Sequence, residues 1–137
     1  MRAWRCETAV FLVIAAGLLT VSNATSKDIT GKNMSAKDIR HDIIGRTIFL
    51  AAPVTGEFPL NYRKNGVVDG EGAALGLGRF VKPNDTGKWW IEGNKLCQQF
   101  KTWYNGAKRC FSLVRLDTSS VKWILGNGDT GIARIGD

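Results

Sequence analysis

Apolar residues after Gly45 occur in short runs that turn-forming residues interrupt. The runs predict strands at residues 46–52, 58–63, 67–69, 73–81, 88–92, 95–101, 108–116, 121–125 and 132–135. The turns between them include Lys64-Asn65-Gly66, Gly93-Asn94, Asn105-Gly106 and Gly126–Gly131. Sequential hairpins at this spacing predict a mainly β fold, in which an antiparallel meander forms either a small curled sheet or an up-and-down barrel.

One short helix is predicted before the first strand. Ser35 is followed three positions later by Asp38, which is the arrangement of a capping box at the start of a helix. Ile39 and Ile43 then lie on one face, and Gly45 can end the helix. The chain has 16 glycines and three prolines, and glycine at this density favours tight turns between short strands.

Residues 1–24 have the order of a secretory signal peptide. Arg2 and Arg5 supply a positively charged start, and residues 8–21 form an uncharged, almost wholly apolar run. Ala24 ends the segment with a small residue at the expected cleavage point. The apolar run is shorter than the ~20 residues that a membrane-spanning helix needs. We therefore predict a cleaved signal peptide, with an uncleaved anchor as the alternative.

After cleavage we expect a flexible lead-in at residues 25–34 and a single β-rich domain at residues 35–137, with no transmembrane segment. Its location is predicted to be periplasmic or secreted. Cys6 leaves with the signal peptide, so Cys97 and Cys110 are the two cysteines that remain. In an oxidising compartment they have one possible pairing, and we predict a structural disulfide. A metal-binding or reactive pair is the alternative, although a zinc site would need two more ligands.

Composition and net charge exclude some classes of protein and favour certain partners. Hydrophobic residues make up 44% and charged residues 23% of the chain, as in ordinary globular proteins, which argues against intrinsic disorder. The length of 137 residues excludes a multidomain enzyme. The formal net charge is +7. In an exported protein this charge favours anionic envelope components as partners, and we expect no nucleic acid.

Two Asp-Thr-Gly motifs, at residues 85–87 and 129–131, resemble the paired motifs of aspartic proteases. Here polar turn residues precede both motifs, whereas the proteases place them at the end of an apolar strand. We interpret both as turns in which the side chains bond to the backbone. Asp85, Asp129 and Glu71 are the candidate carboxylates of an alternative hypothesis, a small hydrolase.

Aromatic and basic residues are interleaved in the C-terminal half of the chain. Trp89 and Trp90 must point to opposite faces of a strand, so we expect one in the core and the other exposed or capped. Exposed rings beside cations suit an anionic or sugar-containing ligand, or a protein partner. Alternatively, the tryptophans fill the core and the lysines maintain solubility. The predicted ligand-binding residues are Trp90, Trp103, Tyr104, Arg79, Lys82 and Lys88.

A Gly-x-Trp…Leu-Cys…Cys pattern extends through residues 38–135 and includes Gly87-Lys88-Trp89-Trp90, Leu96-Cys97 and Cys110-Phe111. In this pattern the chain resembles small exported proteobacterial proteins that form an uncharacterised family. The resemblance implies a periplasmic or secreted β-domain with a structural disulfide. It transfers no active site, because the shared pattern contains no catalytic motif.

The leading hypothesis is a non-enzymatic domain that binds a small ligand, an envelope component or a protein partner. We predict no cofactor and no metal. The alternatives are the small hydrolase and a protein-type enzyme inhibitor, which would present a loop such as Asp117–Ser120. A concave pocket lined by aromatic side chains would favour the binding domain, and two carboxyl groups converging in a cleft would favour the hydrolase.

Overall fold

The computed structural model describes residues 31–52, 56–72 and 84–137. The predicted signal peptide and the predicted strand at residues 73–81 lie outside the described residues. The described chain contains one α-helix, α1 (Ala36–Asp42), and one 3-10 helix, η3 (Trp103–Gly106). Its strands are β1 (Lys32–Asn33), β2 (Thr47–Ala52), β3 (Gly56–Tyr62), β4 (Val67–Glu71), β5 (Asn84–Glu92), β6 (Lys95–Phe100), β7 (Arg109–Arg115), β8 (Ser120–Leu125) and β9 (Thr130–Ile135).

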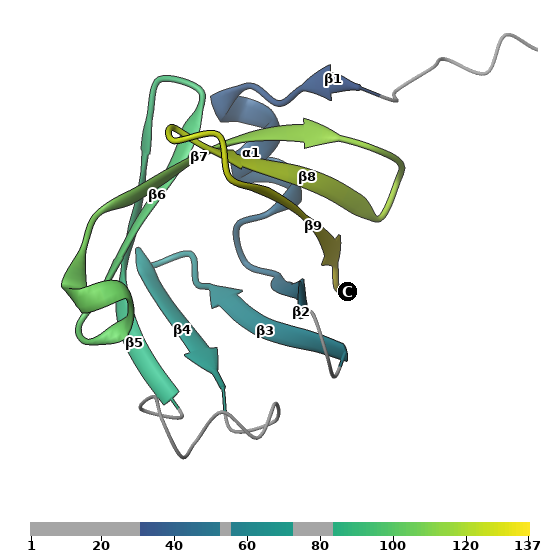
Figure 1. Ribbon diagram of the computed structural model, residues 1–137. Coiled ribbons are helices and arrows are strands. Elements are labelled where there is room, and N and C mark those ends of the chain that lie inside the picture. The colour runs from purple at the N-terminus through teal and green to yellow at the C-terminus, as the bar shows by residue number, and fades with distance from the viewer. Residues whose placement is uncertain (1–30, 53–55, 73–83) are drawn as a thin grey trace, which may run out of the picture.

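Strands β2 to β9 form a closed antiparallel barrel (Figure 1). Each of these strands pairs with the next in the chain, and β9 returns to pair with β2, which places Ala133 opposite Leu50. The short strand β1 lies outside this closed set and pairs with β7. The predicted mainly β meander is confirmed. Of the two predicted forms, it is the barrel, because the pairing of β9 with β2 closes the sheet.

The end of the predicted flexible lead-in, residues 31–34, differs from the expectation. β1 pairs with β7, and the backbone N–H of Met34 donates to the Leu113 carbonyl at 2.8 Å. The Met34 side chain is buried in the core. Burial of an unbranched apolar side chain, together with these backbone bonds, offsets the entropy lost when the segment is ordered.

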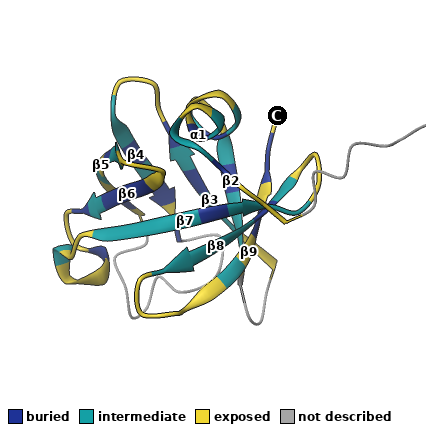
Figure 2. Ribbon diagram, turned by 90° about the horizontal axis from the view of Figure 1, so that it is seen from above, coloured by how far each residue is buried: buried dark blue, intermediate teal, exposed yellow. Residues whose placement is uncertain are grey.

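Helix α1 packs against one end of the barrel, and Figure 2 marks its buried positions. Its predicted capping box is confirmed: the Ser35 hydroxyl accepts the Asp38 N–H at 3.2 Å, and the Asp38 carboxylate accepts the Ser35 N–H at 2.9 Å. Ile39 and Ile43 are fully buried. The first helical N–H donates to Oδ1 of Asn94, at 2.9 Å, in the turn between β5 and β6.

The connections between strands alternate between the two ends of the barrel because neighbouring strands are antiparallel. The end beside α1 carries the turns at residues 63–66, 93–94 and 116–119. The opposite end, which we call the η3 end, carries η3 and the turn at residues 126–129. One end is therefore covered by a helix with buried isoleucines, and the described connections of the other end are η3 and one short turn.

Gly70 in β4 makes room for a tryptophan inside the barrel. A Cβ at this position would lie 2.4 Å from Cζ3 of Trp103. The Trp103 ring packs against Phe58 and Phe100, with ring centroids 5.0 and 4.9 Å away. The missing side chain of Gly70 is thus what allows this aromatic group to fill the η3 end of the core.

We expect Gly70→Ala to lower the free energy of unfolding by about 1–3 kcal/mol, because the added methyl group overlaps the Trp103 indole. Gly126→Ala is the matched control, since a Cβ at Gly126 meets nothing within 4 Å. Urea unfolding followed by tryptophan fluorescence measures both variants. Equal stability of the two would contradict the packing role of Gly70.

Cys97 in β6 and Cys110 in β7 are direct register partners and form a disulfide, as predicted. The two residues are separated by 13 positions, and the chain between them contains η3. Cys97 is fully buried. The bridge therefore joins neighbouring strands beside the connection that frames the η3 end.

Replacing both cysteines by serine (Cys97→Ser with Cys110→Ser) should lower the free energy of unfolding by about 3 kcal/mol, because the unfolded chain regains the entropy that a short loop removes. Urea midpoints with and without reductant test this. Reduction should shift the wild-type midpoint and leave that of the variant unchanged. A wild-type midpoint that does not respond to reductant would argue against a stabilising bridge.

Candidate functional site

A cavity of about 70 Å³ lies inside the barrel. Its apolar lining residues are Ile43, Ile48, Leu50, Leu60, Leu96, Phe111, Leu113, Val121, Trp123 and Ala133. Tyr62, Gln98, Tyr104 and Arg109 supply the polar groups. The interior of an eight-stranded barrel is either nearly filled by side chains or wide enough for one small ligand, and here the side chains leave an unfilled space. The site is thus an apolar chamber with a few polar groups.

Tyr62 and Gln98 form a buried hydrogen bond between β3 and β6. The Tyr62 hydroxyl donates to Oε1 of Gln98 at 2.6 Å, and both side chains are buried. Burial, with a smaller effect of the nearby Tyr104, raises the pKa of Tyr62 far above its usual value. The Tyr62 side chain is therefore neutral, and its hydroxyl hydrogen forms the hydrogen bond to Gln98.

Arg109 faces the same cavity from β7. It is the register partner of Gln98, and directly opposite residues in antiparallel strands share one face of the sheet. Its guanidinium carbon lies 4.1 Å from the centre of the Tyr104 ring, which stacks on it. The Nε atom of Arg109 is buried and has no hydrogen-bond partner. A buried N–H without an acceptor is costly, so this atom is a donor suited to a ligand acceptor.

The conformation of η3 places Tyr104 over Arg109. Tyr104 and Asn105 both adopt left-handed backbone conformations, with φ of 57° and 55°. The Gln99 amide donates to the Gly106 carbonyl at 2.9 Å and holds the end of the turn. Tyr104 is 44% exposed and also lines the cavity, so the chamber reaches the surface at the η3 end.

Asp85 anchors the start of the same connection. Its Oδ2 accepts the backbone N–H groups of Thr102 and Trp103, each at 2.7 Å, and its Oδ1 accepts that of Thr86 at 2.9 Å. Burial acts to raise the pKa of Asp85, but the hydrogen bonds from Trp103, Thr102 and Thr86 outweigh it and hold the pKa below its usual value. This carboxylate is therefore ionised and fully engaged with backbone.

The structure separates the predicted ligand-binding residues into different environments. Tyr104 lines the cavity, whereas Trp103 is buried in the aromatic packing of the core. Trp90 lies on the outer face with Lys88, whose Nζ is 5.7 Å from its ring centre. Arg79 and Lys82 lie outside the described residues. A separate outer surface around Trp90 and Lys88 remains a prediction. Trp89 and Trp90 occupy opposite faces as predicted, with the Trp89 side chain in the core.

The carboxylates of the hydrolase hypothesis do not converge. Glu71 pairs with Asn84, and Asp85 pairs with Gly70, so Glu71 and Asp85 point to opposite faces of the sheet. Asp129 lies in the exposed turn between β8 and β9, where its carboxylate accepts the Asn127 amide at 2.8 Å. Asp85 and Asp129 bond to neighbouring groups of the chain, Glu71 is exposed on the outer face, and the three acids do not face a common cleft.

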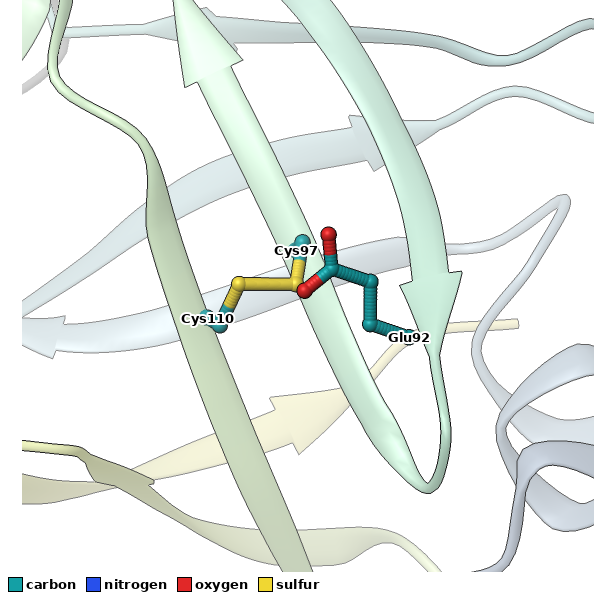
Figure 3. A group of neighbouring side chains, drawn as sticks. All are labelled: Glu92, Cys97 and Cys110. Atoms are coloured by element: carbon teal, nitrogen blue, oxygen red, sulfur yellow. A yellow bond between two sulfur atoms is a disulfide. The ribbon is translucent and has the colours of Figure 1, made fainter.

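Glu92, Cys97 and Cys110 form a cluster on the outer face of β5, β6 and β7, and among the described residues they are the group closest to metal-ligand geometry (Figure 3). The two sulfur atoms are bonded to each other and are therefore not thiolate ligands. The Glu92 carboxylate accepts a hydrogen bond from Nζ of Lys108 at 2.7 Å. The cluster is a disulfide beside an ion pair.

The loop that an inhibitor would present is a tight turn. The Asp117 carboxylate accepts the Ser119 N–H at 2.7 Å and the Ser120 hydroxyl at 2.6 Å. These short-range bonds hold the turn together within its own sequence.

Three polar residues of the cavity were not among the predicted site residues: Tyr62, Gln98 and Arg109. A signal for one of them exists in the sequence, because Gln98 is the polar member of an alternating set whose other inward positions, Leu96 and Phe100, are apolar. Their convergence depends on the register of three strands and is not visible in any local pattern.

No family model matches the chain, and the searches of curated proteins and of solved structures return no match either. Within the described part of the chain, neither helix has the length and apolar character of a membrane-spanning segment.

At pH 7 we expect Asp85→Asn to be less stable than wild type by about 1–3 kcal/mol, because hydrogen bonds to a charged acceptor are weakened. The folded-state pKa of Asp85 lies below its unfolded value of about 3.9. The stabilisation that this carboxylate provides is therefore fully present above the unfolded-state pKa of about 3.9. It is lost as the pH falls through the folded-state pKa. Urea unfolding at pH 7, 4 and 2.5 should show the difference between the two proteins narrowing.

Asp129→Asn is the control, since it changes the same residue of the other Asp-Thr-Gly motif at an exposed position. We expect it to alter stability by less than about 1 kcal/mol at each pH. A gap between Asp85→Asn and wild type that stays constant from pH 7 to pH 2.5 would rule out the anchoring role of the charged carboxylate.

Proposed function

We propose that this chain is a non-enzymatic, exported binding domain that holds a small, largely apolar ligand inside its barrel. The observation that carries the proposal is the interior cavity, where ten apolar side chains surround one hydrogen-bonded Tyr–Gln pair and one buried arginine donor. Apolar walls with a few placed polar groups are the usual design of a small-molecule site.

The size of the cavity supports a small ligand. Its volume of about 70 Å³ is well below the about 300–1,000 Å³ of pockets for drug-sized molecules. Each Å² of apolar ligand surface removed from water contributes about 25 cal/mol, so even a short hydrocarbon chain gains from entering the chamber. Exposed Tyr104, which also lines the chamber, indicates an entry at the η3 end.

The chemistry of the lining supports binding over catalysis. The cavity lining among the described residues contains no Asp, Glu or His, and thus none of the usual general bases. The polar groups that are present belong to Tyr62, Gln98, Tyr104 and Arg109. Such a set can position a ligand by hydrogen bonding.

An exported location is part of the proposal. The charged start and apolar run of residues 1–24 predict a signal peptide, and the Cys97–Cys110 disulfide is compatible with an oxidising compartment. The resemblance to small exported proteobacterial proteins points the same way. We therefore propose a periplasmic or secreted domain.

Ala133→Leu tests the interior site. Ala133 lines the cavity, and a leucine there adds three carbon atoms to the lining, so binding of hexan-1-ol should weaken at least about tenfold while the fold is kept. Ala51→Leu is the matched control, because Ala51 is exposed on the outside of β2 and next to Leu50, which faces inward. NMR titration of backbone amides measures both affinities.

Equal affinities of Ala133→Leu and Ala51→Leu would place the ligand elsewhere and overturn the proposal. Native mass spectrometry of the exported protein provides a second measurement, since a bound small molecule should be retained by Ala51→Leu and lost from Ala133→Leu.

A further inference from the structure

We infer that the ligand carries one anionic head group, a carboxylate on a short apolar body, and that Arg109 binds it. This inference rests on the proposed interior site and adds the chemical class of its occupant. Arg109 is the one charged residue in the cavity lining among the described residues. A single cation among apolar walls suits a monoanion better than a phosphate, which carries more charge and usually recruits several cations.

No carboxylate among the described residues neutralises the charge of Arg109. None of the ion pairs among the described residues includes Arg109. The two internal segments outside the described residues, 53–55 and 73–83, contain neither Asp nor Glu. A partly buried guanidinium without a carboxylate partner is unfavourable, and an anionic ligand would supply the missing partner.

Arg109 and Gln98 both offer hydrogen-bond donors at this end of the cavity. The Nε–H of Arg109 is buried and unpaired. The Tyr62 hydroxyl donates a hydrogen bond to Oε1 of Gln98. The group that Gln98 can offer to a ligand beside Arg109 is therefore its NH₂ donor. A cluster of donors selects a ligand that accepts several hydrogen bonds, and a carboxylate accepts through both of its oxygens.

Tyr104 fixes the direction in which Arg109 donates. Its ring covers one face of the guanidinium at 4.1 Å, so the N–H groups in the guanidinium plane are the groups available to a ligand. The side chain of Tyr104 also lies where the chamber meets the surface. The carboxylate is therefore bound below Tyr104, and the apolar body of the ligand extends toward Leu113 and Val121 on the side of α1.

The experiment compares hexanoate with hexan-1-ol, which share a six-carbon chain but differ in the charged head group. The chain is purified with its disulfide intact, and affinities are measured by NMR titration at pH 7. Wild type should bind hexanoate at least about tenfold more tightly than hexan-1-ol, since hydrogen bonds to a charged group are among the strongest. Arg109→Gln should abolish this preference, so that the ratio of the two affinities falls to about one.

Arg134→Gln is the matched control. The guanidinium carbon of Arg134 also lies 4.1 Å from an aromatic ring, that of Phe49, but the side chain is on the outer face and donates to Glu57 at 2.8 Å. This variant should keep the wild-type preference for hexanoate. Arg109→Lys retains the charge without the planar guanidinium and should show an intermediate preference.

The outcomes separate the two proposals. If wild type binds acid and alcohol equally well, the carboxylate inference is wrong and the interior site stands. If neither compound causes shifts at the cavity residues, the interior site itself is wrong. Because the acid–alcohol comparison is made on wild type, the inference can fail even if Arg109→Gln does not fold. Loss of the preference in Arg134→Gln would also overturn it.

Discussion

Hydrogen bonding between β9 and β2 is the constraint on which the rest of the structure depends. It joins residues 48–50 to residues 133–135 and converts a meander of hairpins into a closed barrel. Only after closure do inward positions of all eight strands face one interior, where Ala133, Val121, Tyr62 and Gln98 contribute to one cavity lining. The apolar chamber and its polar end are consequences of that closure.

A second set of interactions connects the fold to the site. Asp85 holds the backbone of Thr102 and Trp103, and the Trp103 indole occupies the space left by Gly70. The next residue, Tyr104, then stacks on Arg109. The same buried carboxylate that suggested a protease motif thus positions the aromatic ring at the mouth of the chamber. Its role is structural because it accepts hydrogen bonds from three backbone N–H groups that need an acceptor.

Much of the fold could be predicted because its signals are local. The Ser35–Asp38 capping box, the glycine-containing turns and the alternating runs each lie within a few residues, and most observed elements follow them. An exception is Asp85-Thr86-Gly87, which was interpreted as a turn and is part of β5. The site was harder to predict. Tyr104 was included and does line the cavity, but Trp103 was included and is packed in the core. The local sequence around an aromatic residue with basic neighbours is the same whether the ring faces a ligand, another ring or solvent.

The amino-acid sequence by itself determined the local order of this protein: one capped helix, a succession of hairpins and two cysteines able to bridge adjacent strands. Tertiary structure alone decided that the sheet closes and that Arg109 meets Gln98, Tyr62 and Tyr104 around one cavity. The physical reason is that alternation assigns a side chain to a face of its own strand. Which distant side chains then share a space depends on the register and closure of the whole sheet.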